Sequence, residues 1–138
     1  MNVSVALRLG RVSNLPTVWT NMLAGIILVG GAADDPRVWP MVGAMSLFYV
    51  GGMYLNDAFD ADIDAIERPE RPIPSSQVSR TTVFRLGFAM LALGIALLTW
   101  AGFGWPGGTG VWPPLCGLGL AIAIIAYDRH HKTNAMSP

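Results

Sequence analysis

The chain has 138 residues, of which 52% are hydrophobic and only 13% are charged. Soluble proteins carry roughly 25% charged residues, so this composition excludes an ordinary soluble enzyme and a disordered tail. Nine basic residues balance nine acidic residues, which excludes a nucleic-acid-binding protein. The single cysteine, Cys116, excludes an intramolecular disulfide framework and a cysteine-rich metal site. The composition is that of a short membrane protein.

Four largely apolar stretches follow one another along the chain, at residues 15–33, 38–57, 84–103 and 111–127. A transmembrane helix needs about 20 apolar residues to cross about 30 Å of hydrocarbon. Glycine and proline are compatible with such helices, because neighbouring helices satisfy the backbone and small residues allow close approach. The sequence therefore predicts an all-α fold, a polytopic membrane helix bundle with about four transmembrane helices.

The basic residues predict how these helices are oriented. If all four stretches cross the membrane, eight of the nine basic residues share one side: Arg8, Arg11, Arg68, Arg71, Arg80, Arg85, Arg129 and Lys132. Arg37 lies on the other side, where Trp39, Trp105 and Trp112 fit an aromatic belt. An excess of positive charge marks the cytoplasmic side. We therefore expect a multi-pass protein of a bacterial inner membrane, with both ends of the chain in the cytoplasm.

Six of the nine acidic residues lie between Tyr54 and Pro74, in what we call the acidic segment. It begins at the end of the second apolar stretch and enters a cytoplasmic connector expected over residues 56–80. Ionisable groups next to the hydrocarbon are costly, and those that occur there are usually functional. The acidic segment is therefore the first candidate for a functional site.

Helical geometry predicts which of these acidic residues act together. At about 100° per residue, Asn56, Asp57, Asp60 and Asp64 share one face of a helix, and Asp62 lies on the far side. Hard oxygen ligands suit Mg²⁺, which binds one or two carboxylates together with substrate phosphates. The rise from Asn56 to Asp64 is about 12 Å on a straight helix, so the face suits two ions along a diphosphate, or one ion plus hydrogen bonds. The alternative is a solvated acidic helix end.

Two arginines follow the acidic face, Arg68 and Arg71. Guanidinium groups bind phosphate oxygens bidentately, so acids that hold a metal beside these arginines predict a site for a polyanion. Pro69, Pro72 and Pro74 are expected to end the helix and stiffen the connector above the acidic face. The alternative for these prolines is a simple helix terminator.

These residues resemble a known family. The string NDAFDADID at residues 56–64, followed by RPERPI at residues 68–73, resembles the first aspartate-rich motif of the UbiA superfamily of intramembrane prenyltransferases. Residues 7–25 resemble the first span of that family. The resemblance implies that this chain binds a prenyl diphosphate and Mg²⁺ and transfers the prenyl group to an aromatic or other lipophilic acceptor.

The resemblance also implies roles for individual residues. Asn56, Asp60 and Asp64 are expected to bind Mg²⁺, and Asp57, Asp60 and Asp64 to serve as catalytic residues. Arg68 and Arg71 are expected to contact the diphosphate or to order the connector.

Further candidates lie outside the acidic segment. After the fourth stretch, Lys132 is expected to contact the diphosphate, with Arg129 as a competitor and membrane anchoring as an alternative. Adjacent histidines point in different directions on a helix, so metal binding by His130 and His131 is not favoured.

The prenyl tail is expected in a channel between apolar helices. Met53, Tyr54 and Phe59 are candidates for the wall of this channel. Ordinary packing between helices is the alternative for each of the three.

The chain also departs from the family pattern. Family members have about nine helices and a second acidic motif, DxxxD, whereas Asp128 is the only acid after the acidic segment here. We therefore expect the front half of a longer enzyme, inactive alone. A CDP-alcohol phosphotransferase is disfavoured because the segment contains no Asp-Gly or Ala-Arg pair. A non-catalytic membrane protein that binds or carries a lipid diphosphate remains the alternative, and the oligomeric state is open.

Overall fold

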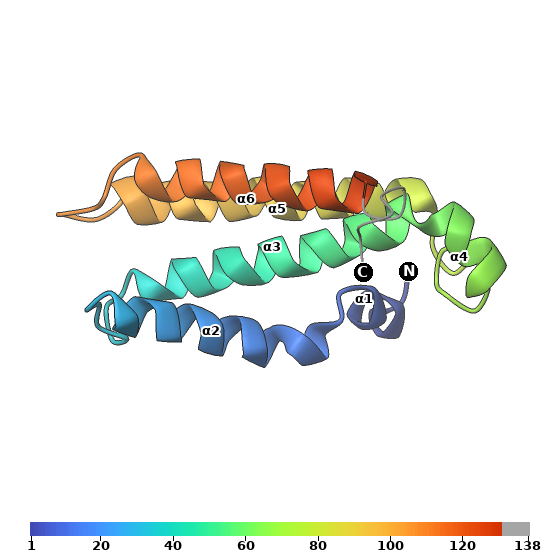
Figure 1. Ribbon diagram of the computed structural model, residues 1–138, viewed down its shortest axis with the longest axis horizontal. Helices are drawn as coiled ribbons and strands as arrows, with labels where there is room; N and C mark the ends of the chain where they lie inside the picture. The colour runs from blue at the N-terminus through green and yellow to red at the C-terminus, as the bar shows by residue number, and fades with distance from the viewer. Residues whose placement is uncertain (131–138) are drawn as a thin grey trace.

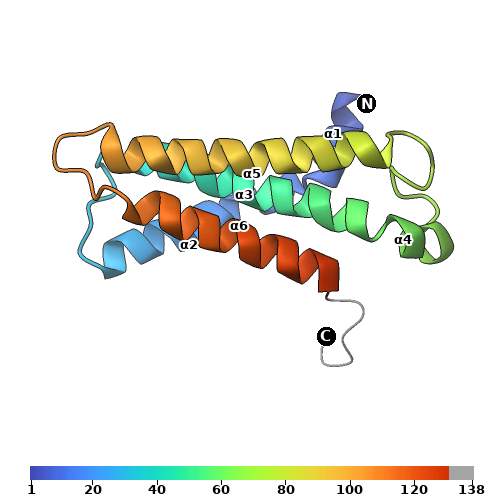
Figure 2. The same ribbon diagram turned by 90° about the horizontal axis from the view of Figure 1, so that it is seen from above.

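A computed structural model describes residues 1–130 of the chain. Within this range every regular element is helical. The elements are α1 (Val3–Leu9), the 3-10 turn η1 (Val12–Asn14), α2 (Leu15–Leu28), α3 (Val38–Phe59), α4 (Ala61–Glu67), α5 (Arg80–Phe103) and α6 (Trp112–His130). The four longer helices run side by side, and α1 and α4 lie together at one end of them (Figures 1 and 2). The all-α prediction is confirmed for the described residues.

Helix α3 is the centre of the bundle. It packs against α5 along most of its length and also contacts α2, α6 and α1. In Figure 1, α2 lies on one side of α3, and α5 and α6 lie together on the other. Helices α2, α3 and α6 therefore surround a space that no further helix of the described residues fills.

Glycines bring α3 and α5 close together. A Cβ atom added at Gly51 would lie 3.1 Å from the carbonyl oxygen of Gly87, and one added at Gly87 would lie 2.8 Å from the side chain of Leu55. Small residues allow helix backbones to approach one another, and the buried Leu55 and Phe48 fill the space on either side of this approach. These glycines therefore serve contact between helices.

The helix boundaries correct part of the sequence prediction. Helices α3 and α5 cover the stretches expected at residues 38–57 and 84–103, and α6 begins one residue after the start of the stretch expected at residues 111–127; each helix extends its stretch by a few residues at one end. The first stretch, expected at residues 15–33, ends as a helix at Leu28, because Gly30 takes a positive φ of 80° and turns the chain.

Two of the described helices, α3 and α5, are long and apolar enough to cross a membrane. The apolar helical stretch Val12–Leu28 is shorter than this requirement. Helix α6 is not among the candidate spans, and its last turn contains the charged residues Asp128 and Arg129. The prediction of about four transmembrane helices is thus supported for two, and the larger count stays a prediction.

One contact ties together the two connectors at the end of the bundle far from α4. The Arg37 guanidinium donates to Asp35 over 3.0 Å and to the carbonyl oxygen of Gly107 over 3.3 Å. The hydrogen bonds that the Arg37 side chain and backbone donate to Asp35 lower the pKa of that carboxyl from its usual value to about 2. At the opposite end lie α1, α4, the start of α5 and the end of α6 (Figure 1). These elements and the connectors next to them carry seven of the eight basic residues grouped by the sequence, and Lys132 lies outside the described residues. Orientation in a membrane stays a prediction.

Candidate functional site

The acidic segment bends at Asp60. Helix α3 ends at Phe59, α4 begins at Ala61, and Asp60 lies at the junction as the last cap of one helix and the first cap of the other. Figure 1 shows α4 turned away from the line of α3. The sequence predicted one straight helix over residues 56–64, and this prediction is wrong because the chain bends at Asp60. The prolines that follow α4 fit its end at Glu67, as expected.

Arg80, at the start of α5, stabilises this bend. The last carbonyl groups of a helix have no partner within the helix. The Arg80 guanidinium donates to the carbonyl oxygen of Ala58 over 2.7 Å and to Asp62 over 3.0 Å. The Asp62 side chain is 82% exposed, which agrees with its predicted place on the far side from the other acids. The sequence grouped Arg80 only with the basic side, since no local pattern shows which helix end an arginine will reach.

Arg71 brings two of the predicted carboxylates together. Its Nη1 atom lies 2.6 Å from Oδ2 of Asp64 and 3.3 Å from Oδ1 of Asp57. The side chains of Asp64 and Asp57 are 1% and 9% exposed. Two buried carboxylates repel one another unless a positive charge lies between them, and Arg71 supplies that charge.

The other predicted residues lie in different surroundings. Asp60 is buried at the bend, and Asn56, one turn earlier on α3, faces a cavity between helices. The side chain of Arg68 is exposed and makes no hydrogen bond or ion pair within residues 1–130, so the structure does not bring it into the acidic cluster. Lys132 and His131 lie outside the described residues.

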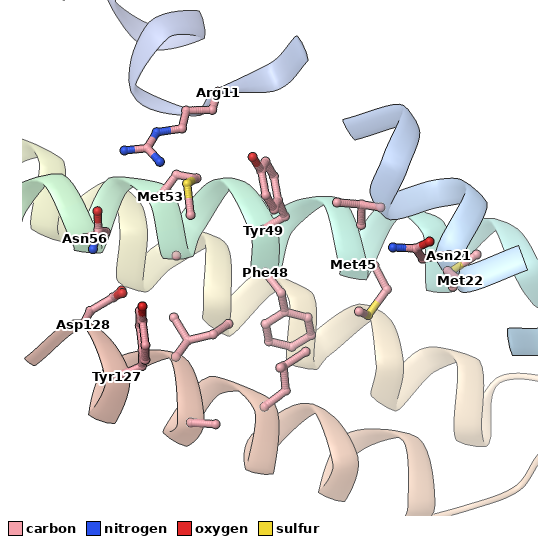
Figure 3. A pocket seen from close by; sticks show the side chains of 15 residues that line it. Arg11, Asn21, Met22, Met45, Phe48, Tyr49, Met53, Asn56, Tyr127 and Asp128 are labelled. Carbon is pink, nitrogen blue, oxygen red and sulfur yellow. The ribbon is translucent and has the colours of Figure 1, made fainter. Parts of the chain in front are cut away.

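A cavity of about 900 Å³ lies between α2, α3 and α6. We call it the large cavity. Figure 3 shows Arg11, Asn56 and Asp128 at one end of it. The rest of its wall is mostly apolar and includes Met22, Met45, Phe48, Met53, Leu120 and Ile124. The large cavity therefore combines a polar end beside the acidic cluster with an apolar body inside the bundle.

The expected channel wall is right in one residue of three. Met53 lines the large cavity. Tyr54 turns the other way, and its hydroxyl donates to the carbonyl oxygen of Ala6 in α1 over 3.1 Å. Phe59 packs edge-on against Phe84 of α5, with ring centres 4.9 Å apart. Tyr54 and Phe59 therefore belong to contacts between helices.

The sequence missed Arg11 as a member of the site. This residue has a left-handed backbone, with φ 44° and ψ 43°, between α1 and η1. Such a conformation is uncommon for a residue with a side chain and is often found where function requires it. It places the Arg11 guanidinium 3.6 Å from Asp57 and at the polar end of the large cavity. The sequence signal was only a basic residue close to the first apolar stretch.

Residues 17–133 match the UbiA prenyltransferase family. The chain belongs to this family. The resemblance drawn from the acidic segment is thus confirmed by a match that covers most of the chain.

Curated relatives in this family are named digeranylgeranylglyceryl phosphate synthase. The chain is 34% identical to that of Methanopyrus kandleri over 94 residues, which are 67% of this chain and 34% of the relative. It is 31% identical to that of Metallosphaera sedula over 127 residues, which are 91% of this chain and 42% of the relative. The chain thus spans between about a third and two fifths of the length of these relatives. No solved structure matches the chain.

The donor set fits the Mg²⁺ that the UbiA family implies. Oδ1 of Asp64 is buried and accepts no hydrogen bond from residues 1–130, while Oδ2 of Asp64 and Oδ1 of Asp57 both face the positive charge of Arg71. Within residues 1–130 no three His, Cys, Asp or Glu side chains lie together as a metal cluster. Mg²⁺ commonly binds through one or two carboxylates and completes its shell with water and phosphate oxygens. Asp64, with its unused buried oxygen, and the buried Asp60 one turn before it are two such carboxylates, so these residues fit the ion.

Proposed function

We propose that this chain binds a prenyl diphosphate and takes part in the Mg²⁺-dependent transfer of its prenyl group to a lipophilic acceptor. The observation that carries the proposal is the large cavity, whose apolar body ends at Arg11, Asn56 and Asp128. Arg11 lies 3.6 Å from Asp57, and Arg71 joins Asp57 to Asp64. Apolar burial favours the prenyl tail in the body, and paired carboxylates with arginines favour a metal-bound diphosphate at the end.

The proposed roles follow the sequence prediction. Asn56, Asp60 and Asp64 hold Mg²⁺, and Asp57 supports them through the arginines that it contacts. When bound, Mg²⁺ withdraws negative charge from the diphosphate and so makes it a better leaving group. The bond between the allylic carbon and the diphosphate oxygen breaks, and a nucleophilic atom of the acceptor bonds to that carbon and loses its proton.

Three basic residues are proposed to face the departing diphosphate. Arg71 contacts the carboxylates of Asp57 and Asp64, and its guanidinium is proposed to bind phosphate oxygens when the diphosphate is present. Arg68 and Lys132 are proposed to contact the same group when it is bound. Charge that develops on the diphosphate is stabilised by such fixed cations.

The names of the relatives support a narrower acceptor class. Their printed product contains a glyceryl phosphate. We therefore propose a lipid with a glyceryl phosphate headgroup as the acceptor, in place of an aromatic ring. We also propose an integral membrane protein whose acidic segment faces the cytoplasm, in agreement with the two apolar helices and the basic residues at that end.

Binding measurements test the proposal. In detergent micelles the chain is expected to bind geranylgeranyl diphosphate in the presence of Mg²⁺ and to lose most of that affinity with EDTA. Asp64→Asn is expected to weaken the Mg²⁺-dependent binding at least tenfold, because a ligand charge is lost beside a polyanion site. Glu67→Gln is the matched control and is expected to bind as the unchanged chain does, since Glu67 is exposed at the end of α4 and makes no ion pair within the described residues.

A melting curve for each variant separates loss of binding from loss of fold. Binding that is independent of Mg²⁺, or equal in Asp64→Asn and the unchanged chain, would contradict the proposal. Release of pyrophosphate when an acceptor is added would show an enzyme rather than a lipid diphosphate carrier, and would overturn the expectation that this chain is inactive alone. A carrier binds the diphosphate and releases no pyrophosphate when an acceptor is added.

A further inference from the structure

A second, smaller cavity of about 250 Å³ lies between the end of α1 and the connector that follows α4. We call it the arginine cavity. It is lined by Arg8, Arg11, Asp57, Glu70, Arg71 and Pro72. Three guanidinium groups thus face two carboxylates. Asp64 lies just behind this lining, 2.6 Å from Arg71, so Arg71 and Arg11 are already paired with carboxylates and an anion would meet the charge of Arg8.

Arg8 is the guanidinium of the arginine cavity that has no carboxylate partner among residues 1–130. Its Nη2 atom donates to the side-chain oxygen of Gln77 over 2.8 Å, which orients the guanidinium, and it makes no ion pair within residues 1–130. Arg11 and Arg71 differ, because both lie close to Asp57, at 3.6 Å and 3.3 Å. A neutral partner holds Arg8 in place without cancelling its charge.

The two acids of the arginine cavity leave room for an anion. Asp57 is buried and already faces Arg11 and Arg71. Glu70 is exposed at the rim, where water weakens its repulsion. A planar guanidinium group can bind two oxygens of one phosphate at the same time. Several guanidinium groups around one cavity therefore fit a phosphate.

The arginine cavity adjoins the large cavity. Arg11 lines both of them, with its left-handed backbone at the boundary. A ligand in the arginine cavity therefore lies one side chain away from the polar end of the apolar cavity. A lipid with an anionic headgroup would place that headgroup in the arginine cavity and its reacting hydroxyl at the polar end of the large cavity.

We propose that the arginine cavity binds the phosphate monoester of the acceptor lipid, and that Arg8 is the residue dedicated to it. This inference rests on the proposed function, which supplies the class of acceptor. The diphosphate and the acceptor phosphate then occupy adjoining places that share Arg11, Asp57 and Arg71, while Arg8 lies on the acceptor side alone.

Binding of a defined lipid pair tests this assignment. The probes are a long-chain alkylglyceryl phosphate and the matching alkylglycerol without phosphate, each titrated into the chain in zwitterionic detergent micelles. The chain is expected to bind the phosphate lipid about tenfold more tightly than the alkylglycerol, and Arg8→Gln is expected to remove this preference. Arg85→Gln is the matched control, because Arg85 is exposed at the same end and lines neither cavity.

Each other outcome overturns the assignment. Equal binding of the two lipids means that the cavity does not recognise phosphate. An equal loss in Arg8→Gln and Arg85→Gln means that general surface charge attracts the lipid. Inorganic phosphate that binds as tightly as the lipid means that the site serves free phosphate. Mg²⁺-dependent binding of geranylgeranyl diphosphate is measured in parallel. If that binding is absent, the proposed function fails, and if it persists while the lipid preference is absent, only this inference fails.

Discussion

Arg71 is the residue on which the acidic cluster depends. It is the cation between Asp57 and Asp64, and the side chain of Asp64 is almost completely shielded from solvent. The sequence predicted both the acids and the arginine, because their spacing places them near one another. It did not predict that Arg71 would contact the acids directly, because the bend at Asp60 sets the direction of the following connector. Arg11 was missed for a related reason, since its reach depends on a left-handed residue between two helices.

Replacing Arg71 therefore tests the cluster at the scale of one residue. Arg71→Gln is expected to lower the free energy of unfolding by about 3 kcal/mol, because removing one partner leaves buried carboxylates without compensation. Arg68→Gln is expected to change it by less than about 0.5 kcal/mol, because the Arg68 side chain is exposed and makes no ion pair within the described residues. Thermal unfolding in the same detergent compares the two variants. Equal melting temperatures would show that the cluster does not depend on Arg71.

At the scale of elements, two breaks decide the shape of the protein. The turn at Gly30 ends α2 early, and the bend at Asp60 divides the acidic segment into two helices. Hydrophobic pattern predicted the long helices well, because their apolar runs have the length of a membrane span. It missed both breaks, because apolar residues continue past Leu28 and helix-forming residues continue past Asp60. Arg80 from α5 stabilises the second break, and that contact is invisible in the local sequence.

The close approach of α3 and α5 makes its own prediction. Gly51→Ala is expected to lower the free energy of unfolding by about 1–3 kcal/mol, because the added Cβ would lie 3.1 Å from the backbone of Gly87 and force the helices apart. Gly25→Ala in α2 is the matched control, with nothing within 4 Å of the added Cβ. Alanine is the better helix former, so this variant is expected to be neutral or slightly stabilised. Thermal unfolding of the two variants checks the difference, and equal destabilisation would contradict it.

At the scale of the whole molecule, the basic residues and the large cavity can be compared with what the sequence predicted. The sequence predicted a common side for most basic residues, and the described ones lie at the end that holds α1, α4 and the acidic segment. It also predicted an apolar channel, but only Met53 of its three proposed wall residues lines the large cavity. Which face of α3 meets α5 and which meets the cavity depends on contacts with helices distant in sequence. A nearly uniform apolar helix carries little pattern that could reveal this choice.

The large cavity gives a prediction for the whole bundle. Ala123→Trp on α6 is expected to fill part of the cavity and to weaken Mg²⁺-dependent binding of geranylgeranyl diphosphate about tenfold. Excluding about two methylene groups of the tail, at about 0.8 kcal/mol each, accounts for such a loss. Ala92→Trp on α5 is the matched control, because Ala92 is exposed and lies outside the cavity. Titration of both variants with the same diphosphate measures the effect. Unchanged affinity in Ala123→Trp would mean that the tail lies elsewhere.

The glycine contact between α3 and α5 also has a consequence for movement. Closely packed interiors resist deformation, so two helices joined backbone to backbone move as one body. Helix α2 packs mainly on α3, and α6 completes the opposite wall of the large cavity. Widening of that cavity therefore falls to α2 and α6, while the carboxylates on the α3 side keep their positions. The proposed prenyl tail would then enter or leave between α2 and α6 while Asn56 and Asp57 on α3 keep their positions.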